Sequence, residues 1–283
     1  MSVTRLTILG SGSSGGVPRA NGDWGLCDPD NRKNRRLRCS ALIEHAADTD
    51  ALRAGEAVTR IVIDTSPDFR EQMLAARVPR IDAVLITHDH ADQTHGLDDL
   101  RAFALLQRQR IPVWMDAAAA KTLTTRFGYA FTAPPGSPYP AILDRQALPP
   151  MGEALVIDGA GGAVEVTGFD QEHGAIRSVG FRFGALAYSA DINGLPDASA
   201  AVLSGVGCWV VDALRLEPHP THFDVSDALR EIRRVGAHTA VLTNLHITLD
   251  HDALSADLPE GVRCAHDGLQ ILAEDGAISF QDR

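Results

Sequence analysis

The sequence predicts a layered α/β protein made of a single domain, and three observations support this prediction. Short β-branched runs alternate along the chain with longer amphipathic segments, which is typical of layered α/β folds. The composition, with 45% hydrophobic and 22% charged residues, is close to the globular average and provides for a sizeable core. The length of 283 residues fits one large domain, so we expect a single domain over residues 1–283.

The predicted strands are short runs rich in Val, Ile, Leu and Thr, bounded by residues that favour turns. Such runs occur at Leu6–Leu9, Ala41–Glu44, Ile61–Asp64, Ala83–Thr87, Val164–Thr167, Ser178–Phe183, Leu186–Ser189, Trp209–Asp212, Thr239–Thr243 and Leu269–Leu272. Several of them alternate with helical segments, which supports the layered arrangement.

The predicted helices carry apolar residues three or four apart, which places those residues on one helix face. These segments are Phe69–Ala76, Leu97–Gln107, Ala117–Phe127 and Val225–Val235. In the last of them, Ser226 and Asp227 suit the first helical turn. The Pro- and Gly-rich stretches Ala133–Pro140 and Leu148–Gly152 predict a long loop, a natural place for a substrate lid or a seam between two halves.

Charge and hydropathy argue against several classes of function. With 37 acidic and 26 basic residues the formal net charge is −11, which disfavours binding to a long nucleic acid. No apolar run approaches the roughly 20 residues that span a bilayer, and the N-terminus lacks a signal-peptide pattern, so we expect no membrane partner and a cytoplasmic location. The cysteines form no CxxC pair, and we expect buried or idle thiols at Cys27, Cys39, Cys208 and Cys264.

The clearest chemical signal lies in Leu85–Gly96, where an apolar strand runs directly into potential metal ligands. Residues two apart on an extended segment point to the same side, so His88 and His90 can converge on one cation. Asp92 follows at the turn into the next helix, from which its carboxylate can reach an adjacent cation. Two imidazoles and a carboxylate in this position predict a metal site.

At these residues the chain resembles the metallo-β-lactamase superfamily, whose motif reads HxHxDH. Later segments match the family's other metal-binding elements in the expected order: Glu172-His173-Gly174, Tyr188-Ser189-Ala190-Asp191 and Val241-Leu242-Thr243-Asn244-Leu245-His246. The resemblance implies two divalent metal ions, manganese or zinc, with iron as a further option. By this likeness the first metal binds His88, His90 and His173, Asp191 bridges, and the second metal binds Asp92 and His246. It also implies a four-layer αββα sandwich.

Two residues depart from the family pattern. Gln93 stands where the motif has its third histidine, and Asn244 stands where related sequences often have the last histidine ligand. Because imidazole binds first-row divalent metals better than a carboxamide, we expect His95 and His246 to rebuild the second site together, with Gln93 as a weak ligand or as a residue that contacts the ligands. The alternative for His95 is a polar residue that faces solvent at a helix start. Cys27 lacks neighbouring cysteines, so the additional zinc site of the related phosphodiesterase is not expected.

Within the superfamily the chain is most similar to the PhnP-like branch of phosphodiesterases. The likeness rests on Leu9–Pro18, Arg38-Cys39-Ser40, Gly96–Arg101, Ser189-Ala190-Asp191 with Gly194-Leu195-Pro196, and Thr221-His222-Phe223-Asp224. It implies that His222 acts as a general acid on the leaving oxygen, whereas the alternative is a structural loop histidine. Backbone N–H groups of the loop Gly10–Gly16 suit an anion, although any tight turn also requires such glycines. The basic segment Arg32–Arg38 suits either a phosphate contact or a solvated loop face.

Together these observations predict a metal-dependent hydrolase, favouring a phosphodiesterase that acts on a small linear or cyclic phosphodiester. A hydroxide activated by two cations would attack the substrate, with Asp92 and His222 in the catalytic machinery. The alternatives are hydrolysis of a lactone or thioester, RNA processing of the tRNA 3′-endonuclease type, and a non-enzymatic metal protein. The net charge disfavours RNA, and six or seven candidate ligands exceed the four of a closed structural zinc site. A homodimer is compatible with the sequence.

Overall fold

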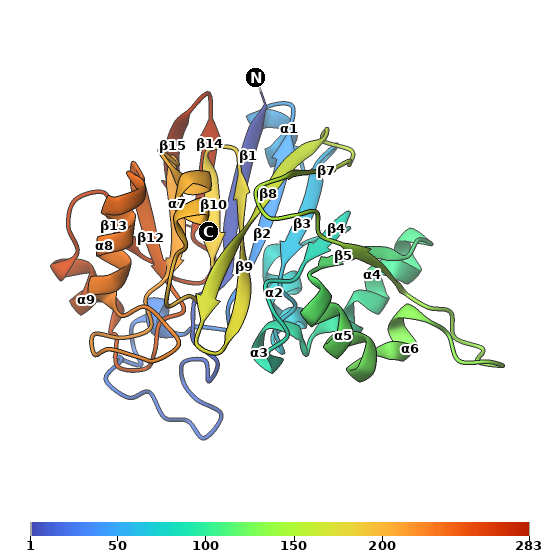
Figure 1. Cartoon of the computed structure of the whole chain (residues 1–283), viewed down its shortest axis with the longest axis horizontal. Coiled ribbons are helices and arrows are strands. Elements are labelled where there is room, and N and C mark those ends of the chain that lie inside the picture. Colours follow the sequence, from blue (N-terminus) through green and yellow to red (C-terminus); the bar gives the residue numbers. More distant parts are fainter. Residues whose placement is uncertain (1, 283) are drawn as a thin grey trace.

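The computed structural model describes residues 2–282, and within this range two β-sheets stack face to face between layers of helices (Figure 1). The first sheet has eight strands in the order β15-β14-β1-β2-β3-β4-β5-β6. Their bounds are β1 (Val3–Gly10), β2 (Ser40–Ala46), β3 (Thr59–Ile63), β4 (Ala83–Leu85), β5 (Ile111–Met115), β6 (Leu143–Ala147), β14 (Gln270–Glu274) and β15 (Ala277–Gln281).

The second sheet has seven strands in the same described range, in the order β13-β12-β11-β10-β9-β8-β7. Their bounds are β7 (Ala154–Ile157), β8 (Val164–His173), β9 (Ile176–Phe183), β10 (Leu186–Ser189), β11 (Cys208–Asp212), β12 (Thr239–Thr243) and β13 (Val262–Cys264). This arrangement confirms the predicted αββα sandwich.

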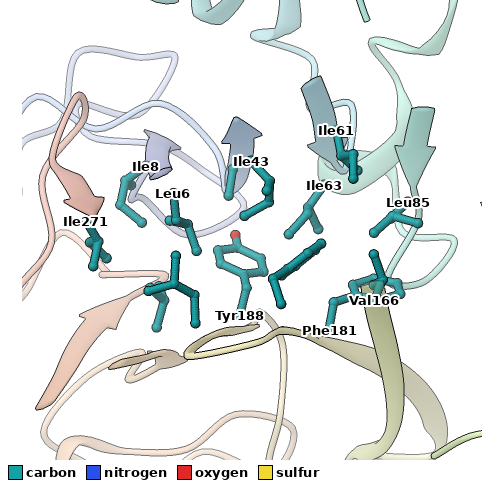
Figure 2. Close-up of a cluster of buried hydrophobic side chains, with 14 of the residues drawn as sticks. Leu6, Ile8, Ile43, Ile61, Ile63, Leu85, Val166, Phe181, Tyr188 and Ile271 are labelled. Atoms are coloured by element: carbon teal, nitrogen blue, oxygen red, sulfur yellow. The ribbon is translucent and has the colours of Figure 1, made fainter. Parts of the chain in front are cut away.

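The largest apolar cluster fills the space between the two sheets. Leu6 and Ile43 of the first sheet face Phe181 and Tyr188 of the second, as Figure 2 shows. Neighbouring residues on the same strands, such as Leu42 after Ala41 and Val62 after Ile61, belong to a different cluster on the outer face. Successive side chains of a strand point to opposite faces. Both faces of these strands are therefore buried, which explains why the strands read as continuous apolar runs.

Helices cover the outer face of each sheet. On the first sheet these are α2 (Phe69–Ala76), α4 (Leu100–Gln107), α5 (Ala117–Arg126) and α6 (Gly128–Phe131). On the second sheet they are α7 (Asp197–Leu203), α8 (Val225–Val235) and α9 (His251–Asp257). Helix α8 begins where the Asp224 carboxylate accepts the N–H of Asp227 at 2.8 Å, and it ends at Gly236 with φ 66°. The shorter elements are α1 (Thr49–Ala54), α3 (Ala91–Thr94), η1 (Arg32–Asn34) and η2 (Leu97–Asp99).

The structure confirms the predicted strands and helices with two differences: β8 runs on to His173 instead of ending at Thr167, and the segment Leu97–Gln107 begins as the 3-10 turn η2 before α4. It also adds strands that the sequence did not reveal, namely β5, β6, β7, β13 and β15. The four cysteines are buried thiols, as expected. Across residues 2–282, no helix combines the length and the apolar character needed to cross a membrane.

The ends of several strands meet at one edge of the sandwich, at the bottom of Figure 1 beside α3. β4 leads into the histidine segment, β8 ends at His173, and β10 leads into Asp191. β11 ends at Asp212, and β12 leads into Asn244. Because these strands come from both sheets, their ends place polar side chains from distant parts of the sequence around one point.

Candidate metal centre

Three histidines form the centre of this edge. His88 follows β4, His90 precedes α3 and His173 ends β8, and one ring nitrogen from each lies within 4.8 Å of the other two. The distance between His173 Nε2 and His90 Nδ1 is 3.4 Å. His88 Nε2 is buried and has no hydrogen-bond partner among the described residues. A buried ring nitrogen without a partner, beside two more imidazoles, fits a divalent cation.

The orientation of His88 depends on Thr87 and Asp64. The Thr87 hydroxyl lies 2.8 Å from Asp64 Oδ2 and 3.0 Å from His88 Nδ1. Burial raises the pKa of Asp64 well above its usual range, while hydrogen bonds from the Thr87 backbone N–H and hydroxyl lower it. The Thr87 hydroxyl donates to Asp64 Oδ2, so its oxygen accepts from His88 Nδ1–H. This tautomer leaves the lone pair of His88 on Nε2, where a metal would bind.

His173 is held in the same way from the other sheet. Its Nδ1–H donates to the backbone carbonyl of Thr221 at 2.7 Å, which leaves Nε2 with a lone pair. Burial lowers the pKa of His173 and lowers the pKa of His88 to about 4. Both imidazoles are therefore neutral at pH 7, as metal binding requires.

Asp191 is the carboxylate nearest to the three histidines. Its Oδ2 lies 3.9 Å from His88 Nε2, and its carboxylate lies within 4.8 Å of ring nitrogens of His173 and His222. Asp191 has φ 50° and Asn244 has φ 62°, so both occupy the left-handed region. Residues held in this sparsely populated region cluster at functional sites. The strand ends thus fix the two side chains at some conformational cost.

The half-buried His222 forms a dyad with the buried Asp212. His222 Nδ1 lies 2.7 Å from Asp212 Oδ2, and the N–H of Ile192 also donates to this oxygen at 3.1 Å. Burial opposes protonation of His222, but the carboxylates of Asp212, Asp191 and Asp92 outweigh it and raise its pKa to about 9. A cation bound by the three histidines would work against this increase. The dyad fixes the ring and can keep a proton on it.

The histidines and carboxylates open into a cavity of about 690 Å³. Ser13, Ser14 and Gly15 of the Gly/Ser loop line it, and so do Arg19 and Arg215. The first serine of the loop has a different role, because Ser11 is buried and donates to Asp267. The cavity therefore offers hydroxyls and two guanidinium groups close to the predicted metal ligands.

Most of the predicted site residues meet at this cavity. His90, Asp92, His173, Asp191, His222 and His246 line it, and His88 completes the three-histidine group behind His90 and His173. His246 is already engaged, since its Nε2 lies 2.8 Å from the Arg19 guanidinium and its Nδ1 lies 3.0 Å from the Thr248 hydroxyl.

His95, expected to help rebuild a second metal site, is absent from the cavity lining that most of the other candidate ligands share. His95 follows the short helix α3, is exposed to solvent, and packs edge to face on Phe127 with 5.8 Å between ring centroids. The alternative interpretation, a polar residue facing solvent, describes its position.

Sequence reasoning did not identify four residues of the site: Thr87, Asp212, Arg19 and Arg215. It also assigned no chemistry to Asp64. A usable signal existed for the aspartates, because Asp64, Asp191 and Asp212 each end or closely follow a buried strand. The basic segment Arg32–Arg38 is largely structural, since Arg36 is 1% exposed and Arg38 pairs with Asp68.

The sandwich and the cluster at its edge define the class of a metallohydrolase, and the comparisons agree. Residues 59–247 match the family described as "Beta-lactamase superfamily domain", and the chain belongs to the metallo-β-lactamase superfamily. Within it, the chain falls in the PhnP-like branch. A crystal structure of a diphosphatase from the PhnP family is 31% identical, with a TM-score of 0.81 over 96% of this chain and 98% of that chain.

Two further proteins are similar to this chain. The metallo-β-lactamase fold protein YhfI from Bacillus subtilis has a TM-score of 0.69 over 96% of this chain and 100% of its own, and at 16% identity it supports the fold alone. A protein of Porphyromonas gingivalis (strain ATCC BAA-308 / W83) named octanoyltransferase is 30% identical over 98% of this chain. The chain spans about half of that relative, 53% of its length.

Proposed function

We propose that this metallo-β-lactamase-fold hydrolase cleaves a small substrate with a phosphodiester or diphosphate linkage, and that His222 is its general acid. The observation that carries the proposal is the His222–Asp212 dyad, which lines the same cavity as His90 and His173. The likeness to a diphosphatase of the PhnP family supports the phosphorus chemistry.

The residues of the centre have separate tasks. His88, His90, His173 and Asp191 would hold a divalent cation, which supplies Lewis-acid activation of a substrate oxygen and of an attacking water. Asp212 accepts a hydrogen bond from Nδ1–H of His222 and so fixes the ring. Nε2 then holds the proton that the leaving oxygen needs. Proton transfer from a positioned group contributes typically ~10²–10⁴-fold to the rate.

The lining of the cavity supports an anionic substrate in spite of the net charge of −11. The positively charged guanidinium groups of Arg19 and Arg215 line the cavity, and Ser13 and Ser14 add hydroxyl donors. Guanidinium groups and hydroxyls are suited to phosphate oxygens. The volume of about 690 Å³ is that of a small-molecule site. These features favour a small phosphate ester over a long nucleic acid.

Acyl chemistry is the second candidate, because the relative from P. gingivalis is named an octanoyltransferase. That name belongs to a protein of which the chain spans 53%. An uncharged acyl group would also gain less from the positive charges of Arg19 and Arg215 than a phosphate would. Acyl thioester and lactone hydrolysis therefore form the competing arm of the experiment.

The test compares substrate classes on the metal-loaded protein. We expect bis(4-nitrophenyl) phosphate and an alkyl nucleoside phosphodiester to be hydrolysed with higher kcat/KM than an octanoyl thioester or a lactone. His222→Ala should keep its metal and lower kcat on the alkyl ester by ~10²–10⁴-fold, with a smaller loss on the nitrophenyl ester, whose leaving group needs no proton.

The matched control is His238→Ala, which removes an exposed histidine from outside the cavity lining and should leave kcat unchanged. If a lactone or thioester outruns both phosphodiesters, the proposed substrate class is wrong. If His222→Ala lowers kcat equally on both esters, His222 is not the proton donor.

A further inference from the structure

We propose that the centre binds one divalent cation, not two, because the amide groups of Gln93 and Asn244 occupy the place of a second cation. The inference does not depend on the substrate. It concerns the carboxylate oxygens of Asp191, Asp92 and Asp212 that the two amide groups contact.

Each amide nitrogen bridges two carboxylates. Gln93 Nε2 lies 2.7 Å from Asp191 Oδ2 and 3.4 Å from Asp92 Oδ2. Asn244 Nδ2 lies 3.0 Å from Asp191 Oδ1 and 3.2 Å from Asp212 Oδ1. A second cation bound to Asp92 and Asp191 would need the space between their oxygens, and the Gln93 amide already fills it.

The chemistry of the neighbours determines which amide atom faces the carboxylates. An ionised carboxylate only accepts hydrogen bonds. If the amide oxygen took the place of the amide nitrogen, it would lie against the carboxylate oxygens with no proton between them, and the contact would be repulsive. Asn244 has a further constraint, since the Cys39 thiol donates to its Oδ1 at 3.5 Å. Gln93 is 0% exposed and Asn244 is 1% exposed, so neither amide can turn to water instead. Both side chains thus present protons where a metal ligand would present a lone pair.

The histidines that could replace the missing ligands are positioned for other contacts. His95 is exposed and packs on Phe127. His246 Nε2 faces the Arg19 guanidinium at 2.8 Å, and because arginine only donates, this contact uses the imidazole lone pair. The Arg19 charge also opposes a cation at that nitrogen.

Charge balance leads to the same conclusion. Four amide hydrogen bonds of 2.7–3.4 Å reach Asp191, Asp92 and Asp212, and their N–H dipoles offset part of the negative charge that a second cation would neutralise. Asp191 then serves as a terminal ligand on the histidine side, with its other lone pairs occupied by the two amides. The side chains fit one cation and do not fit a second.

The experiment counts bound metal. The protein is stripped with a chelator and dialysed to equilibrium against Mn²⁺ or Zn²⁺, and the total number of bound ions per chain is then measured by mass spectrometry. We expect one ion per chain and, with Mn²⁺, the electron paramagnetic resonance spectrum of an isolated ion. Two ions per chain, or a spin-coupled pair, would overturn the proposal.

Variants test whether the amides are the cause. Gln93→His with Asn244→His should raise the metal content to two ions per chain and produce spin coupling. The matched control Gln93→Ala with Asn244→Ala removes the donors without adding imidazole ligands, so its gain in affinity for a second ion should be smaller than that of the double histidine variant. If the double histidine variant melts as a folded protein and still binds one ion, the role given to the amides is wrong. Should it fail to fold, each single histidine variant is measured instead, with fractional gain expected. Because no substrate is used, failure of the proposed phosphodiesterase activity would leave this result unaffected.

Discussion

Two groups of side chains around the Asp191 carboxylate have opposite polarity. His88, His90 and His173 present ring nitrogens, and hydrogen bonds at the opposite ring edge leave a lone pair on Nε2 of His88 and of His173. Gln93 and Asn244 present amide protons. His88, His173 and Asn244 lie at or just after strand ends, whereas Gln93 lies in the short helix α3. The comparison teaches that a change of side chain, with the backbone position kept, turns a cation site into a proton-donor site.

The largest effect is expected on the imidazole side, from His88→Ala. This variant removes a buried ligand whose Nε2 has no other partner in the described chain, so metal affinity should fall by more than about 100-fold, beyond the loss typical of an outer-shell change. It should also lose the metal-dependent rise in Tm, which at a hundredfold excess over Kd corresponds to ~2.7 kcal/mol of stability in the wild type. Chelator competition and thermal melting with and without metal measure both quantities. Wild-type metal content in this variant would contradict the assignment of the centre.

A smaller effect should follow from Thr87→Val, which keeps the shape of the side chain and removes the hydroxyl between Asp64 and His88. Without that hydroxyl the tautomer of His88 is no longer fixed, so metal affinity should fall by ~10–100-fold. The matched control is Thr7→Val, a buried threonine whose hydroxyl has no partner among residues 2–282. Chelator competition compares the two variants. Equal affinity in Thr87→Val and Thr7→Val would show that the hydroxyl does not orient His88.

The sequence predicted the interior of the sandwich and missed its edges. The ten predicted strands lie inside the sheets or beside one edge strand, and several of them, such as β3, β10 and β11, are buried along their whole length. Four of the strands it missed, β6, β15, β7 and β13, are the edge strands of the two sheets. Edge strands alternate between buried and exposed positions, as Leu143–Ala147 does, and so lack an apolar run. The fifth, β5, contains Pro112, which argues against a strand in sequence-based reasoning.

For the site, the sequence identified polar side chains that directly follow or end an apolar strand, such as His88, His173 and Asp191. It could not identify groups whose role depends on direction. Arg19 reaches His246 from a segment 227 residues away in sequence, and periodicity carries no information about such a contact. The orientation of the Asn244 amide likewise depends on Asp212 and Cys39, which are distant in the chain.

The smallest effect should come from His95→Ala, the substitution that most directly tests the amide side. An exposed histidine that packs on Phe127 contributes to stability within about ±0.5 kcal/mol, as surface substitutions usually do, so the variant should melt close to the wild type. Its metal affinity should also be unchanged, because the ring lies outside both groups of potential ligands found in the described chain. Metal affinity is measured by equilibrium dialysis for His95→Ala and Thr87→Val in parallel. The assay is sensitive enough only if it detects the expected loss of affinity in Thr87→Val. A drop in affinity as large as that of Thr87→Val would return His95 to the ligand set and restore the case for a second cation beside Asp92.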